Sequence, residues 1–180
     1  MIALYLATGF EELEAITIYT VLKRGGVDIK LISITDKLEV MGARGATLTA
    51  NQNINEINYQ ECEMIILPGG ALGANNLLDN VIVQEQLIEF NKKGKWIGAI
   101  CAAPYVLGEL NILDGKQATS YPGFESHLKG AILSENKVVI SGNIVTSRGP
   151  GTALEFAFAI LTILKGKVET DKIMEQMLLK

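Results

Sequence analysis

Cysteine and histidine are scarce in this 180-residue sequence, which contains two cysteines and one histidine. Cys62 and Cys101 are too few and too far apart to form the disulfide framework of a small secreted protein. No spacing of His, Cys, Asp and Glu resembles a metal-ligand motif, and neither a GxGxxG fingerprint nor a P-loop occurs. We therefore expect free thiols, a cytoplasmic location, and no metal or other cofactor.

Clusters of basic residues and long apolar runs are also missing. The net charge is −4, so we expect no nucleic-acid partner. No apolar run approaches the ~20 residues that span a bilayer, and no basic segment with an apolar stretch precedes the first predicted strand. We expect no membrane partner and no signal segment. The apolar share of 48% suffices for a sizeable core, and the length predicts a single domain over residues 1–180.

Short apolar segments alternate with helical patterns along the chain. Strands are predicted over residues 2–7, 27–34, 64–67, 96–100, 117–119, 138–140 and 144–146, with a hairpin within 39–49. The alternation predicts an α/β fold with a parallel sheet covered on both faces. Three loop sequences directly follow strands: TGFE at 8–11, PGG at 68–70, and Cys101-Ala102. Parallel strands would bring these loops to one sheet edge, where ligands bind in this class of fold.

The segment KWIGAICAAPYVL, residues 95–107, predicts a strand that turns sharply into a helix at Cys101. Small residues surround the cysteine, and Pro104 fits the first helical turn, where its missing N–H breaks no hydrogen bond. This pattern is typical of a nucleophile elbow with cysteine in the serine position. Free N–H groups at a helix N-terminus favour the thiolate, so Cys101 is a candidate reactive thiol. The alternative is a small buried cysteine that ends a strand.

Two further groups are candidates to act on this thiol. The turn Pro68-Gly69-Gly70 lacks bulky side chains, and its N–H groups could form an oxyanion hole with that of Ala102; the alternative is an ordinary turn. In the first predicted helix, residues 11–24, Glu14 lies at the edge of the predicted buried face, which comprises Leu13, Ile16, Thr17 and Thr20. A partly desolvated Glu14 would have a raised pKa and could donate a hydrogen bond to the sulfur. The alternative is a solvated carboxylate that the helix dipole favours.

The remaining residues with catalytic side chains are His127 and Cys62. His127 lies in the loop-like segment YPGFESHLKG, residues 121–130, so we expect a solvated histidine and no Cys–His dyad. Cys62 lies between Glu61 and Glu63, which disfavour a thiolate, and we expect it to be non-catalytic.

Four stretches of this sequence also occur, in the same order and at similar spacing, in a known family. They are GFEELEA at 9–15, LPGGALGANNL at 67–77, AICAAP at 99–104 and TSRGPGTALEFA at 146–157. On these stretches the chain resembles the DJ-1/ThiJ/PfpI family, in the branch of the parkinsonism-associated deglycase, over nearly its whole length. The resemblance implies a flavodoxin-like, three-layer α/β sandwich with a mostly parallel central sheet, as in class I glutamine amidotransferases. It also implies a homodimer, for which the first helix and the TSRGPGT turn are the candidate surfaces.

The resemblance implies roles for individual residues. Cys101 resembles the reactive cysteine, and Glu14 resembles the carboxyl that hydrogen-bonds that thiol and its sulfinic form. Gly70 and Ala102 resemble the residues whose backbone amides line the anion pocket. The further candidates for lining the pocket are Gly69, Tyr121, Arg44 and Arg148.

One departure from the family pattern concerns histidine. Close relatives carry a histidine where this chain has Tyr121, and protease-like branches carry one where Ala102 stands. Amide hydrolysis needs a group that protonates the leaving amine, so peptidase and glutamine amidotransferase activities are disfavoured.

The resemblance implies two functions that the same residues would serve. The first is glyoxalase- or deglycase-like action on small reactive carbonyls, without a cofactor, in which Cys101 adds to an aldehyde. The second is a non-enzymatic redox sensor or protective, chaperone-like protein, in which an oxidant converts Cys101 to a sulfinate. Whether the chain is an enzyme stays open at this point. A third alternative, synthesis of thiazole phosphate for thiamine, is suggested only by the family label, because no phosphate cradle is evident.

Overall fold

A seven-stranded sheet forms the centre of the computed structural model, which describes residues 1–179. Its strand order is β10-β11-β7-β6-β1-β2-β5. The strands are β1 (Ile2–Leu6), β2 (Ile29–Ser33), β5 (Gln52–Asn53), β6 (Met64–Leu67), β7 (Trp96–Ile100), β10 (Val138–Ser141) and β11 (Ile144–Ser147). Only the pair β10–β11 is antiparallel; the other neighbouring strands of this sheet are parallel. The mostly parallel sheet is therefore confirmed.

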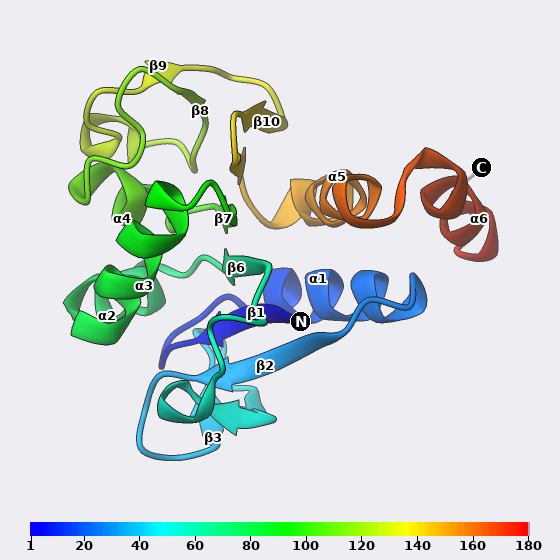
Figure 1. The fold of residues 1–180 in the computed structure, drawn as a ribbon, viewed down its shortest axis with the longest axis horizontal. Helices are drawn as coiled ribbons and strands as arrows, with labels where there is room; N and C mark the ends of the chain where they lie inside the picture. The colour runs from blue at the N-terminus through cyan, green and yellow to red at the C-terminus, as the bar shows by residue number, and fades with distance from the viewer. Residues whose placement is uncertain (180) are drawn as a thin grey trace.

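Helices cover both faces of the sheet (Figure 1). One face packs against α1 (Glu12–Arg24) and α5 (Ala153–Lys165), and α6 (Lys167–Gln176) packs on α5. The other face packs against α2 (Ala71–Asp79), α3 (Val81–Lys92) and α4 (Pro104–Glu109). Alternate residues of β1 enter the two cores, Leu4 on the α1 side and Tyr5 on the α2 side, as the period of two of a strand requires. The three-layer sandwich is confirmed.

Two small sheets extend from this framework. The predicted hairpin forms from β3 (Glu39–Met41) and β4 (Thr47–Thr49), and β8 (Gln117–Ala118) pairs in parallel with β9 (Ile132–Leu133). The sequence did not predict β5 or β9, because two-residue strands are too short to show a period. No helix in residues 1–179 is long and apolar enough to cross a membrane.

The predicted buried face of α1 is wrong. Leu13 and Ile16 are 52% and 43% exposed, and Thr20 is also exposed. The face against the sheet and α5 consists instead of Glu14, Ala15, Ile18, Val21 and Leu22. Both sets have helical spacing, and the more apolar residues at the start of the helix favoured the wrong one. Glu14 is therefore fully buried rather than at the edge of the buried face.

Candidate functional site

Cys101 occupies a strained position between β7 and α4. Its φ of 64° lies in the left-handed region, which a residue with a side chain rarely adopts. Two backbone hydrogen bonds fix it there: its N–H donates to the carbonyl of Ser147 over 2.9 Å, and its carbonyl accepts from Tyr121 over 2.7 Å. Pro104 begins α4, as predicted. This sharp strand-to-helix turn has the geometry of a nucleophile elbow.

Glu14 belongs to α1 and lies beside the Cys101 sulfur at the edge of the sheet. Its Oε2 accepts the Gly69 N–H over 2.7 Å, and its carboxyl also hydrogen-bonds with the Cys101 thiol. A Cβ on Gly69 would lie only 2.5 Å from the Cys101 Cβ and 2.7 Å from the Glu14 Oε2. The absence of a side chain at Gly69 therefore allows the thiol and the carboxyl to meet. The Glu14 Oε1 is buried and has no hydrogen-bond partner among residues 1–179.

The loop after β6 completes the site. The backbone N–H groups of Gly70 and Ala102 lie close enough to the Cys101 sulfur to lower the pKa of its thiol. Gly70 has a φ of 91°, and a side chain there would collide with the carbonyl of Gly9. The Glu11 N–H donates to the Gly69 carbonyl over 2.9 Å, so the loop after β1 is joined to the same place. The predicted meeting of the three strand-ending loops is confirmed.

Burial dominates the acid–base behaviour of the pair. It raises the pKa of Glu14 from 4.5 to about 7, more than the Gly69 N–H and the Cys101 thiol lower it. The predicted direction for Glu14 is confirmed. Burial, followed by the negative charge of Glu14, raises the pKa of Cys101 from 9.0 to about 12. The N–H groups of Gly70 and Ala102 lower the thiol pKa by less.

The N–H groups of Gly70 and Ala102 therefore favour the thiolate, as expected, but they do not set the net direction of the thiol pKa in the resting site. Cys101 is only 9% exposed. The loss of hydration of its sulfur raises the thiol pKa more than the two backbone N–H groups lower it. With a Glu14 pKa of about 7 and a Cys101 pKa of about 12, the thiol keeps its proton just above neutral pH while Glu14 has become a carboxylate. The site is thus a neutral thiol beside a carboxyl group that titrates at about pH 7, rather than a pre-ionised thiol.

Of the other predicted lining residues, Tyr121 lies beside the sulfur, whereas Arg44 and Arg148 have other surroundings. The ring of Tyr121 and the Cys101 sulfur both lie against Gly149, and Tyr121 is 46% exposed. The Arg44 side chain is 81% exposed, and its Nε lies 4.0 Å from the Glu11 carboxylate. Arg148 is half-buried and faces a separate cavity beside the site.

Glu12 is a buried residue beside the site for which the sequence predicted no role. It is 7% exposed, and its Oε1 accepts the N–H groups of Arg44 and Ala46 over 2.7 and 3.2 Å. Gly42 packs directly against this carboxyl, so Glu12 fixes the turn of the β3–β4 hairpin next to α1. The Gly at position 42 was the available signal, but sequence alone does not show what approaches it.

The remaining candidates lie away from this pair. His127 is exposed and pairs with Glu109 over 3.3 Å, which confirms a solvated loop histidine. Cys62 is buried, donates to the Met64 carbonyl over 3.3 Å, and has a pKa raised by burial. In the described part of the chain, no three His, Cys, Asp or Glu side chains form a group that could hold a metal ion.

Several known proteins are similar to this chain in sequence and in fold. The sequence model of the DJ-1/PfpI family matches residues 1–163. Protein DJ-1 homolog A of Arabidopsis thaliana is 36% identical over 178 residues, which cover 97% of this chain and 45% of that protein. Protein dj-1beta of Drosophila melanogaster is 33% identical, with 96% and 94% covered. The glutathione-independent glyoxalase DJR-1.2 of Caenorhabditis elegans is 33% identical, with 94% and 90% covered.

Coverage differs among these relatives. The chain spans 45% and 37% of the two Arabidopsis thaliana relatives, DJ-1 homologs A and B. Among solved structures, the oxidized DJ-1 of Toxoplasma gondii superposes with a TM-score of 0.94 at 33% identity and covers 98% of this chain and 97% of that one. Drosophila melanogaster DJ-1beta gives 0.93 at 32% identity, with 98% and 96% covered. The fold, the elbow and these likenesses agree, and this chain belongs to the DJ-1/PfpI family.

Proposed function

We propose that this protein is a cofactor-independent, glyoxalase- or deglycase-like enzyme that acts on small reactive carbonyls through Cys101. The observation that carries the proposal is the buried pair of Cys101 and Glu14 beneath two backbone N–H groups, in which Glu14 titrates at about pH 7 while the thiol keeps its proton. A group with a pKa of about 7 is well placed to take up and return protons at physiological pH. The named glyoxalase activity of the Caenorhabditis elegans relative supports the same substrate class.

The reaction with methylglyoxal would begin with addition of the sulfur to the aldehyde carbon. The Sγ–C bond forms as the thiol proton passes to the Glu14 carboxylate, and the carbonyl π electrons move onto oxygen. The N–H groups of Gly70 and Ala102, which lie close to the sulfur, would stabilise this oxyanion. Glu14 then protonates it, which gives a hemithioacetal.

The later steps need only further proton transfers and one water molecule. Glu14 removes the proton on the former aldehyde carbon and delivers a proton to the neighbouring carbon by way of an enediol, which leaves a thioester on Cys101. Water cleaves the thioester, restores the thiol and releases lactate. Methylglyoxal and water together contain all the atoms of lactate, so no external oxidant or reductant is required.

Replacement of the thiol tests this proposal. Cys101→Ser should abolish lactate formation from methylglyoxal, because a serine hydroxyl in the same place is a far weaker nucleophile. Cys62→Ser is the matched control, since Cys62 is the other cysteine and its hydrogen bond to the Met64 carbonyl can be made by a hydroxyl. Full turnover by Cys101→Ser, with circular dichroism of a folded protein, would remove Cys101 from the mechanism.

A second candidate function, redox sensing, is favoured by the unpartnered Glu14 Oε1. A buried carboxyl oxygen without a partner is ready to hydrogen-bond an oxygen added to the adjacent sulfur. Two equivalents of hydrogen peroxide would convert the thiol to a sulfenic and then a sulfinic acid and release two waters. Intact mass spectrometry after mild peroxide treatment should show two added oxygens on Cys101, and their absence would count against this function.

The expected homodimer is also a proposal. Leu13 and Ile16 project from α1 and are about half exposed, which leaves an apolar strip on the surface. We expect sedimentation to show a dimer and Leu13→Glu together with Ile16→Glu to shift it towards monomer. A wild-type monomer at high protein concentration would contradict this arrangement.

A further inference from the structure

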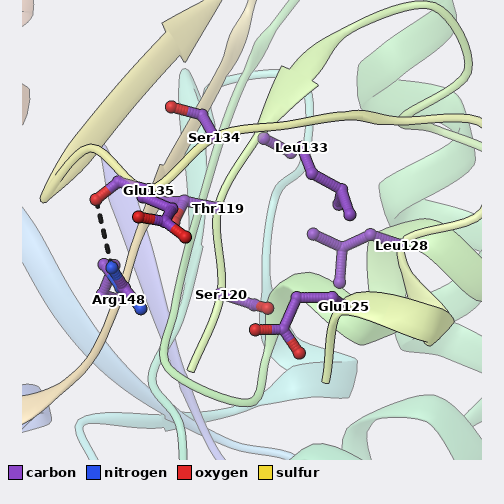
Figure 2. A pocket seen from close by; sticks show the side chains of 9 residues that line it. Thr119, Ser120, Glu125, Leu128, Leu133, Ser134, Glu135 and Arg148 are labelled. Atoms are coloured by element: carbon purple, nitrogen blue, oxygen red, sulfur yellow. Dashed lines mark hydrogen bonds between the residues drawn. The ribbon is translucent and has the colours of Figure 1, made fainter. Parts of the chain in front are cut away.

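A cavity of about 220 Å³ lies beside the thiol site, between β8, β9 and the end of β11 (Figure 2). Its lining comes from four separate segments of the chain. The lining residues are Ala118, Thr119, Ser120, Glu125, Leu128, Leu133, Ser134, Glu135 and Arg148. Figure 2 shows Arg148 and Glu135 on one side and Leu128 and Leu133 on the other. The cavity therefore has Arg148 and Glu135 facing an aliphatic wall, with the Glu125 side chain beside that wall.

The charged side chains in this cavity do not neutralise one another. The Arg148 guanidinium donates a single hydrogen bond, from Nη1 to the backbone carbonyl of Glu135 over 3.2 Å. Among residues 1–179, neither Arg148 nor Glu125 nor Glu135 takes part in an ion pair. Arg148 is half-buried, so its remaining donors lie in an environment where an opposite charge would be bound well.

The carboxylates of Glu125 and Glu135 are also available to bind a ligand. Glu125 accepts one backbone N–H, from Gly123 over 2.6 Å, and its carboxylate points towards Ser120 in Figure 2. No hydrogen bond to the Glu135 carboxylate occurs in the described residues. A simple anion would meet repulsion from these two carboxylates, and a simple amine would meet repulsion from Arg148. A molecule with both charges satisfies all three groups.

The cavity is distinct from the thiol site but adjoins it. Cys101 is not among its lining residues, yet Ser120 precedes Tyr121, whose N–H bonds the Cys101 carbonyl. Arg148 follows Ser147, whose carbonyl accepts the Cys101 N–H. A ligand in the cavity would rest on both segments that hold Cys101 in its strained conformation.

We propose that this cavity binds a small zwitterionic amino acid with an aliphatic side chain, such as leucine. The carboxylate lies on Arg148, the ammonium group lies between Glu125 and Glu135, and the alkyl group contacts Leu128 and Leu133. Charge-assisted hydrogen bonds supply the selectivity, and the aliphatic wall adds apolar contact. The site is separate from the proposed carbonyl chemistry and does not depend on it.

Isothermal titration calorimetry of the full chain with free leucine tests the proposal. We expect saturable binding in roughly the micromolar to millimolar range. N-acetylleucine, which lacks the ammonium group, and leucinamide, which lacks the carboxylate, should each bind at least about tenfold more weakly, or about 1.4 kcal/mol. No saturable binding of leucine at about 10 mM, or equal binding of all three compounds, would overturn the proposal.

Variants locate the site. Arg148→Gln and Glu125→Gln should each weaken leucine binding about tenfold or more, while Arg148→Lys should retain more affinity than Arg148→Gln. Arg24→Gln removes an exposed arginine at the far end of α1 and should leave the affinity unchanged. Cys101→Ser should also still bind leucine, whether or not the thiol proves to be catalytic. Unchanged affinity in folded Arg148→Gln and Glu125→Gln, or lost affinity in Arg24→Gln, would contradict this assignment.

Discussion

Replacement of Glu14 by glutamine should change how the stability of the protein depends on pH. In the native state burial raises the Glu14 pKa from 4.5 to about 7. The native state therefore binds this proton more tightly than the unfolded chain does. The stabilisation is fully present below the unfolded pKa of 4.5 and is lost as pH rises through the native pKa of about 7. At 1.36 kcal/mol per pKa unit, the difference amounts to about 3 kcal/mol.

Glutamine keeps the shape of this side chain and removes its titration. Its amide oxygen can still accept the Gly69 N–H, which Glu14 accepts over 2.7 Å. Urea unfolding of wild type and Glu14→Gln at about pH 5 and about pH 8.5 gives the free energy of unfolding of each. We expect the variant to gain about 2.5 kcal/mol relative to wild type between the two conditions, because only wild type must bury a carboxylate at high pH.

The comparison cancels the titration of other carboxyl groups, since both proteins share them. Two stability curves that stay parallel from about pH 5 to pH 8.5 would refute the inference that burial raises the pKa of Glu14. In that case, the proposed proton exchange with Cys101 would lose its physical basis.

Three further predictions concern the site and its surroundings. Turnover of methylglyoxal should rise as pH increases through about 7, where Glu14 loses its proton. Glu14→Gln should lose both this rise and most of the activity. A wild-type kcat that does not change with pH would contradict the prediction. Gly69→Ala should lower turnover by more than about tenfold, because the new methyl group separates the Cys101 sulfur from Glu14; unchanged kinetics of a folded variant would be inconsistent with the contact. Glu12→Ala should destabilise the protein by about 2 kcal/mol and speed hydrogen exchange of the Arg44 and Ala46 amides, which donate hydrogen bonds to Glu12. Unchanged exchange of these amides would show that the carboxyl does not hold the turn.

The sequence predicted the parts of the site that depend on chain order. Apolar runs alternating with helical patterns require a parallel sheet, and a parallel sheet brings the ends of its strands to one edge. That edge holds Gly70 and Cys101 in contact, as expected, and Pro104 fixes the start of α4. Glu14 was a candidate partner for the thiol from the sequence, although the buried face that the helical spacing predicted for its helix was wrong.

Features that depend on packing from several directions could not be predicted in this way. The thiol pKa follows from the burial of the Cys101 sulfur next to Gly69 and a helix that is distant in sequence. The N–H groups at the elbow, in contrast, are local and can be recognised in the sequence. The true buried face of α1 depends on α5, which lies more than a hundred residues further along the chain. The cavity near Arg148 is assembled from four segments, none of which has a motif of its own.

The position of the pair on the sheet has a consequence for how the protein moves. Cys101 follows β7 and Gly69 follows β6, adjacent strands in the interior of the sheet with further strands on either side. Amide protons in such strands exchange only when large parts of a protein open, so the floor of the site should be among its most slowly exchanging regions. We expect a substrate to enter past the outer segment around Tyr121, because Tyr121 is 46% exposed and its ring and the Cys101 sulfur both lie against Gly149. A molecule could therefore reach the sulfur by displacement of one surface turn while the scaffold below stays closed.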